Sequence, residues 1–159
     1  MILSDKFKFV LMVPPSADYA SGDVTSDVVN MENFDHATIV IATGASSDNE
    51  NVITVNAATD AAGLTKTAIP FKYRSVTTGD TYGDLTDATA TGFACTASSA
   101  NQYHILEIDA KQMETTAAGY EYLSVTVTEA GSETAQLGCV IGILGPCAYQ
   151  YANLPTALT

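Results

Sequence analysis

The chain has 159 residues, enough for one domain that buries about 68–70% of the surface exposed by its unfolded form. Hydrophobic residues make up 47% of the chain and charged residues only 15%, so Thr, Ser, Asn and Gly must supply the polar surface, which is typical of strands and turns. The formal net charge of −12 opposes nucleic-acid phosphates and anionic lipid surfaces, so we expect neither nucleic acid nor membrane as a partner.

The first 25 residues predict an extended N-terminal arm that contains the first strand. Residues 6–13 alternate as a strand, and the two prolines that follow force an extended exit. One side of this strand carries large apolar groups, namely Phe7, Phe9 and Leu11. Residues 16–23 hold one large apolar side chain, Tyr19, and are expected to add little to a core. The apolar run is too short for a signal-peptide core, and no segment reaches the roughly 20 apolar residues of a membrane span, so we expect a soluble chain.

Residues 26–152 are expected to form the body of the domain. Strands are predicted where apolar residues alternate between turn signals, over 24–29, 37–44, 51–58, 67–76, 92–97 and 102–109. The strands over 37–44 and 51–58 are expected to pair as a hairpin. Pro70 cannot donate to a ladder, which predicts an edge or a bulge there. Residues 77–91 are predicted as a long exposed loop, and 110–113 as a helical turn.

The stretch 119–151 predicts a second hairpin around which the other strands are organised. In its first strand Leu123, Val125 and Val127 alternate with hydroxyl side chains, so one face should cover the core. In its second strand, 136–144, apolar residues occupy both faces, so both are expected to be covered. The glycines of this strand and the one after it are expected to permit close backbone packing rather than phosphate binding: Gly138, Gly142 and Gly145.

About eight or nine short strands without alternating helices predict an all-β fold, a two-layer antiparallel β-sandwich of jelly-roll or immunoglobulin-like type. Barrel-like closure of the sheets is the alternative. Residues 153–159 form an uncharged C-terminal tail that could dock on a neighbouring chain or stay loose.

The sequence offers no arrangement typical of an enzyme. His36 and His104 stand in different contexts, with no HExxH spacing and no GxSxG nucleophile elbow. We expect His104 to be a strand residue beside Glu107 or at a sheet edge. The acidic loop 80–87 is the best candidate for a cation site, but its spacing matches no DxDxDG loop. We therefore expect no catalytic residue, no metal and no cofactor.

The three cysteines are an odd set without CxxC spacing, which indicates reduced and mostly buried thiols: Cys95, Cys139 and Cys147. Aromatic side chains form the candidate interface, because tyrosine is large, rigid and amphipathic. These residues are Phe7, Phe9, Tyr19, Tyr120, Tyr122, Tyr149 and Tyr151. An ordinary position at a sheet edge is the alternative for the tyrosines that flank the second hairpin.

Four segments resemble small structural proteins of tailed bacteriophages, and most closely head decoration (cement) proteins. They are DVVNMENFDHATIVI at 27–41, IPFKYR at 69–74, ILEID at 105–109 and GYEYL at 119–123. The resemblance implies a β-rich module without an active site that binds the outside of the major capsid protein as a trimer or dimer and strengthens the expanded shell. Such a protein would be made in the host cytoplasm and located on the capsid surface of the virion.

Two alternatives from other classes stay open. One is a tail or head–tail joining protein, which would be present in few copies. The other is a carbohydrate-binding or adhesive β-sandwich, whose melting temperature should shift with sugar or Ca²⁺. For the capsid role, our hypothesis is that residues 1–25 and the tail make contacts between chains while the sandwich is a spacer.

Overall fold

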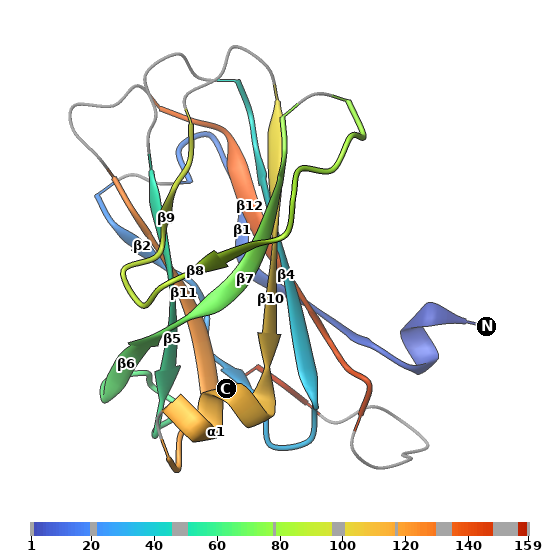
Figure 1. Cartoon of the computed structure of the whole chain (residues 1–159), viewed down its shortest axis with the longest axis vertical. Helices are drawn as coiled ribbons and strands as arrows, with labels where there is room; N and C mark the ends of the chain where they lie inside the picture. Colours follow the sequence, from blue (N-terminus) through green and yellow to red (C-terminus); the bar gives the residue numbers. More distant parts are fainter. Residues whose placement is uncertain are drawn as a thin grey trace.

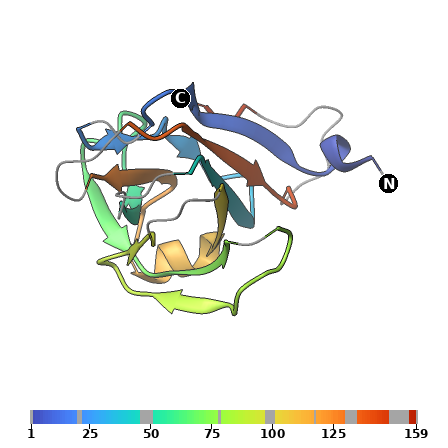
Figure 2. The same ribbon diagram turned by 90° about the horizontal axis from the view of Figure 1, so that it is seen from above.

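The computed structural model describes residues 2–19, 22–45, 51–77, 79–96, 101–116, 118–129, 135–147 and 156–158. Two antiparallel sheets pack face to face as a sandwich and do not close into a barrel (Figures 1 and 2). The predicted all-β, two-layer antiparallel sandwich is therefore confirmed.

Sheet A has six strands in the spatial order β1 (Lys8–Ser16), β12 (Gly138–Leu144), β4 (His36–Thr43), β10 (Gln102–Asp109), β7 (Phe71–Val76) and β8 (Thr86–Ala88). Sheet B has the order β2 (Val24–Thr25), β11 (Tyr122–Thr128), β5 (Val52–Ala58) and β6 (Lys66–Ile69), with β3 (Val29–Asn30) also paired to β11 and β9 (Phe93–Ala94) to β5. A short 3₁₀ helix, η1 (Leu3–Asp5), precedes β1, and one α-helix, α1 (Ala110–Thr116), follows β10.

The core lies between the sheets and follows the alternation of the strands. In β4 every second residue is buried, because successive side chains of a strand point to opposite faces. The largest fully buried aliphatic side chains of the two layers are Ile39, Ile41, Leu106, Ile108 and Leu144 from sheet A and Ile53, Ile69 and Leu123 from sheet B. Burial of each such side chain contributes about 1.5–3 kcal/mol to stability. At one end of the sandwich, α1 places Met113 in this core (Figure 1).

Both predicted hairpins are wrong in their pairing, although their strands exist. β4 lies in sheet A between β12 and β10, whereas β5 lies in sheet B between β11 and β6. In the same way β11 belongs to sheet B and β12 to sheet A. In each case the chain crosses from one layer to the other instead of turning back on itself. The alternation of side chains predicts a strand and its inner face, but it does not specify which strand is the neighbour.

Pro70 marks another change of layer. The predicted strand over 67–76 is divided there into β6, an edge of sheet B, and β7 in sheet A. A residue without a backbone N–H fits this corner, because no ladder hydrogen bond is lost. The predicted loop 77–91 contains β8, which pairs with β7, so this part of the prediction is wrong.

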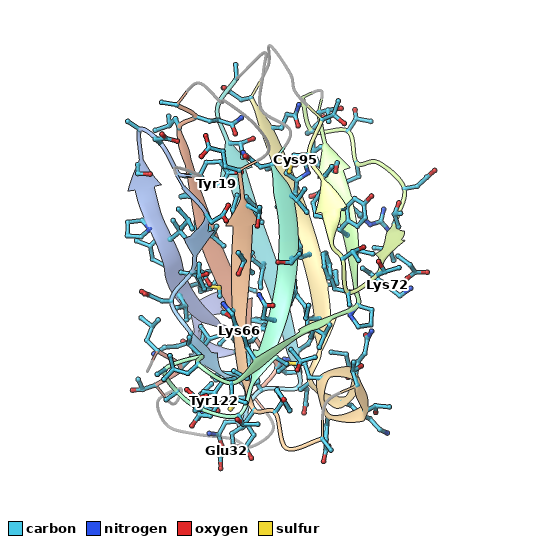
Figure 3. All side chains as sticks on the ribbon, turned by 90° about the vertical axis from the view of Figure 1, so that its left-hand side faces the viewer. Tyr19, Glu32, Lys66, Lys72, Cys95 and Tyr122 are labelled. Atoms are coloured by element: carbon cyan, nitrogen blue, oxygen red, sulfur yellow. The ribbon has the colours of Figure 1, made fainter. Side chains whose placement is uncertain are left out.

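The ends of the chain contribute to the body of the domain more than we expected. β1 is the edge strand of sheet A beside β12, and its Val10 and Met12 point into the core. Tyr19 is only 1% exposed and lies in the core near one end of the sandwich (Figure 3), which corrects the expectation that residues 16–23 add little to it. Ala157 is also buried, and its carbonyl accepts a hydrogen bond from the N–H of Asn30 at 2.7 Å, so this part of the tail docks on its own chain.

The glycines of β12 make room for these N-terminal side chains. A Cβ at Gly138 would lie 2.5 Å from Cδ1 of Tyr19, and one at Gly142 would lie 2.9 Å from Sδ of Met12. No larger residue fits at either position without displacing its neighbour. The prediction that these glycines permit close packing is confirmed.

Candidate interaction surface

The outer face of sheet B is polar. Thr126 of β11 accepts a hydrogen bond from the side-chain amide of Asn56 at 3.0 Å, and its hydroxyl also lies 3.3 Å from that of Thr25. The opposite face of β11 is buried through Leu123, Val125 and Val127. The predicted division of this strand into an apolar face and a hydroxyl face is confirmed, although Ser124 and its cross-strand partner Asn56 are buried on the hydroxyl side.

Part of the outer face of sheet A is apolar, in contrast to that of sheet B. Cross-strand register aligns side chains on the same face, because residues directly opposite each other in antiparallel strands point the same way. One row contains Phe9 and Ile143, and the next contains Leu11, Ile141, Val40 and Ile105. Phe9 and Leu11 are each 46% exposed, and the other four are partly exposed. We call these six residues the apolar face.

A hollow of about 470 Å³ lies at one end of this outer surface, where β1 ends and β12 begins. Small residues, Ala42 and Cys139, lie side by side at its floor, since they are paired across β4 and β12. Larger residues form its walls: Pro15, Val40, Tyr103 and Leu137. The other described residues that line it are Thr43, Gly44, Asn101, Gln102 and Gly138, and none of the described lining residues is an Asp, Glu, Lys or Arg.

Charged side chains occupy the part of the same outer face that lies toward β7 and β8. Glu107 of β10 lies between Thr38 of β4 and Lys72 of β7 in register. Its carboxylate accepts hydrogen bonds from Nε2 of His36 at 2.7 Å and from the hydroxyl of Thr38 at 2.8 Å. Lys72 forms an ion pair with Asp87 of β8. The apolar face is thus bordered by polar groups along β7 and β8.

The contact between His36 and Glu107 shifts the pKa values of both side chains. The hydrogen bond to Glu107 raises the pKa of His36. Partial burial opposes ionisation of Glu107, but the hydrogen bonds from His36 and Thr38 outweigh it and lower the pKa of this carboxyl. Both groups are about one-third exposed, so the pair resembles the surface ion pairs whose net contribution to stability is small. We therefore read it as a structural contact.

His104 is not beside Glu107 and not at a sheet edge, which corrects the prediction. It lies in β10, between β4 and β7, with its side chain in the core and 1% exposed. Its Nδ1 is 2.8 Å from the hydroxyl of Ser75, and the ring of Phe93 meets it edge-on. Desolvation lowers the pKa of His104 to about 4, so the imidazole is neutral at pH 7. The histidine that contacts Glu107 is His36.

The aromatic residues predicted as an interface are dispersed. Phe9 belongs to the apolar face, and Phe7 lies at the base of β1, where a Cβ at Gly145 would be 2.7 Å from its ring. Tyr19 is a core residue, so its place among the expected surface aromatics is corrected. Tyr149 and Tyr151 lie outside the described residues.

The other two tyrosines, Tyr120 and Tyr122, lie at the start of β11 in sheet B and just before it. Tyr120 borders a cavity of about 260 Å³ beside α1, with Glu32 and Glu121 at its rim. Tyr122 is partly exposed at the start of β11 (Figure 3), at the end of the sandwich opposite Tyr19. Neither ring lies on the apolar face, so the structure does not unite the predicted aromatics in one surface.

Thiols and acids do not assemble into a site in the part of the chain that the structure describes. There, no three Asp, Glu, His or Cys side chains are placed to hold a metal ion, and no helix is long and apolar enough to cross a membrane. The cysteines are free thiols. Cys95 is buried, and desolvation raises its pKa to about 12, whereas Cys139 and Cys147 are partly exposed, so the prediction of mostly buried thiols holds for Cys95 alone.

Most of the apolar face was not among the predicted site residues. The missed residues are Leu11, Val40, Ile105, Ile141 and Ile143. The signal was present in β12, whose two faces are both apolar in sequence. The structure covers only its inner face, since Val140 and Leu144 are buried while Ile141 and Ile143 are partly exposed. A strand that is apolar on both faces but covered on one indicates a surface that can be covered by another molecule.

The chain matches no protein-family model, and no curated protein shows significant similarity to it. Among solved structures, it is similar to the crystal structure of the SPBc2 prophage-derived protein YomS, with a TM-score of 0.48 and 18% sequence identity. The similarity covers 87% of this chain and 91% of that chain. At this identity and TM-score it assigns neither an activity nor a partner to this chain.

Proposed function

We propose that this chain is a structural virion protein of a tailed bacteriophage that binds the outside of the capsid and stabilises the shell. The observation that carries the proposal is the apolar face of sheet A, which no other described element of the chain covers. The resemblance of four segments to head decoration proteins supports the same role. In this role the protein acts by binding, without catalysis and without a cofactor.

The contrast between the two outer faces gives the binding mode. Burial of Phe9, Leu11 and the aliphatic residues beside them removes apolar surface from water, at about 25 cal/mol per Å². The outer face of sheet B carries hydroxyl and amide groups, so its burial would give less free energy, and we assign this face to the solvent side. We therefore infer that sheet A faces the capsid protein and sheet B faces the solvent.

The size of the face predicts a weak single contact. The whole outer surface of the four strands β1, β12, β4 and β10, which lie about 4.8 Å apart with about seven residues at 3.4 Å each, covers roughly 450 Å², and the apolar face is only part of it. A stable pair of proteins buries about 800 Å² on each partner. The apolar face alone therefore provides less than about half of the area of a stable contact, so the repetition of copies around a shell must strengthen binding through effective concentration. A net charge of −12 keeps unbound copies soluble at the concentrations that such a role requires.

The test uses capsids prepared without this chain and purified protein added back. Leu11→Ser removes an exposed apolar group from the edge strand of the face, and Leu64→Ser makes the same change in the β5–β6 turn, where Leu64 is 85% exposed. We expect wild type and Leu64→Ser to cosediment with capsids and to raise their resistance to heat. Leu11→Ser should bind at least about tenfold more weakly, a change of about 1.4 kcal/mol.

Equal binding by the two serine variants would show that the apolar face is not the contact. Failure of wild type to bind any capsid would overturn the capsid role itself. A rise in melting temperature with sugar or Ca²⁺, together with no capsid binding, would favour the adhesive alternative.

A further inference from the structure

We propose that copies of this chain associate head to tail, with the N-terminal segment of one copy, residues 2–7, seated in the hollow of sheet A of the next. The occupant of the hollow is the apolar tip of that segment, Ile2 and Leu3. The inference does not depend on the capsid role, because it concerns purified copies of the chain alone.

The N-terminal segment presents apolar groups away from its own domain. Ile2 is 66% exposed and Leu3 is 47% exposed, and η1 contains no buried residue. Both views of the ribbon show this segment beyond the outline of the sandwich (Figures 1 and 2). Its base is attached to the domain where the Phe7 ring packs on Gly145, and within the segment the N–H of Phe7 donates to the carbonyl of Leu3 at 3.0 Å. The tip is therefore held outward by the folded chain.

The hollow has the chemistry that this tip requires. Its floor is lowered by the small Ala42 and Cys139, and its walls are raised by Tyr103 and Leu137. No Asp, Glu, Lys or Arg is among the described residues that line it, in a chain with 18 acidic residues. The segment itself carries one acidic and one basic side chain, Asp5 and Lys6, which cancel. This contact therefore avoids the repulsion that two chains of charge −12 meet elsewhere.

A chain cannot fill its own hollow with this segment. The segment enters β1 at Lys8, beside Leu144, whereas the hollow lies at the other end of β1, beside Gly138. The eight residues from Lys8 to Pro15 span roughly 24 Å in an extended strand. Because tip and hollow are different surfaces at opposite ends of one strand, a contact made once per pair is heterologous, and repetition of it gives an open filament or a closed ring, of which a reciprocal pair of chains is the smallest.

The first experiment measures mass against concentration by sedimentation equilibrium. One small apolar contact predicts weak association, with wild type monomeric near about 10 µM and larger near about 1 mM. Ile2→Ser combined with Leu3→Ser should raise the apparent Kd at least about tenfold, as should Ala42→Glu or the milder Leu137→Ser. Leu64→Ser, a change at an equally apolar exposed site, should leave the Kd at the wild-type value. Wild type that remains monomeric at about 1 mM overturns the proposal.

A mixing experiment separates this contact from any symmetric one. The Ala42→Glu chain keeps its N-terminal segment, and the Ile2→Ser/Leu3→Ser chain keeps its hollow. Each should be monomeric alone, while an equimolar mixture should form one-to-one dimers that grow no further. If wild type associates but the equimolar mixture of the two variants stays monomeric, the segment does not bind the hollow.

The thiol at the floor of the hollow gives an independent readout. Cys139 is partly exposed, so a water-soluble alkylating reagent should reach it in the monomer. Alkylation of Cys139 should slow as the wild-type concentration rises, while alkylation of the partly exposed Cys147 should keep its rate. Parallel slowing of both thiols, or of neither, would contradict occupation of the hollow.

Discussion

His104 is a neutral histidine in the interior of a sheet, in an environment far from that of an imidazole in water. His104 has one polar contact, the hydroxyl of Ser75, and its Nε2 has no hydrogen-bond partner among the described residues. Protonation would place an uncompensated charge beside Phe93 and the aliphatic core. His36 is the opposite case, since a carboxylate stabilises its charged form.

This contrast predicts how stability depends on pH. The folded-state pKa of His104 is about 4, below the ordinary 6.5, so its contribution to stability is present above pH 6.5 and is lost as the pH falls toward 4. Between pH 7.5 and 4.5, wild type should lose on the order of 2 to 3 kcal/mol more than His104→Asn. The measurement is urea unfolding at both pH values. His36→Asn serves as the control and should still lose stability between pH 7.5 and 4.5. The pKa of His36 is raised, so its own contribution to stability grows as the pH falls and cannot cause this loss. Equal losses in wild type and His104→Asn would mean that His104 is not desolvated.

At the scale of elements, the edge strand β1 contributes one row of side chains to the core and the other to the outer surface. Its alternate residues point to opposite faces, with Met12 1% exposed and Leu11 46% exposed. Met12 fills the space that Gly142 leaves open in β12. β1 is therefore part of the sandwich, and only the segment before it projects.

This arrangement predicts different costs for two neighbouring truncations. Met12→Ala should lower the free energy of unfolding by about 2–5 kcal/mol, because it leaves a cavity against β12. Leu11→Ala should lower it by less than about 1 kcal/mol, because its side chain is half in water. Urea denaturation of both variants at one pH measures the difference. Similar costs at the two positions would mean that β1 does not pack on the core in this orientation.

The sequence predicts single strands better than their partners. Residues 102–109 were predicted as a strand and form β10, and 37–44 correspond to β4 within one residue, because alternation of apolar side chains is local information. The pairing of β4 with β12, about 100 residues later in the chain, is set by packing of the two layers and has no local signature. For the same reason the apolar face could not be assembled from the sequence. Its rows join side chains from β1, β12, β4 and β10 that only the register brings together.

At the scale of the whole molecule, the two sheets present unlike surfaces. Sheet B presents hydroxyl and amide groups, whereas sheet A presents an apolar face bordered on one side by the contacts of Glu107 and Lys72. No described element of the single chain covers that face. A role in which one side meets a protein shell and the other meets solvent accounts for this asymmetry.

The most direct measurement of this role is the number of copies of the chain per purified particle. Particles from a density gradient would be analysed by quantitative mass spectrometry against the most abundant shell protein. A ratio near one, or a simple fraction of it, is the result that binding across the capsid predicts. A few copies per particle would place the protein at the tail or the head–tail joint instead, and absence from particles would contradict a virion role.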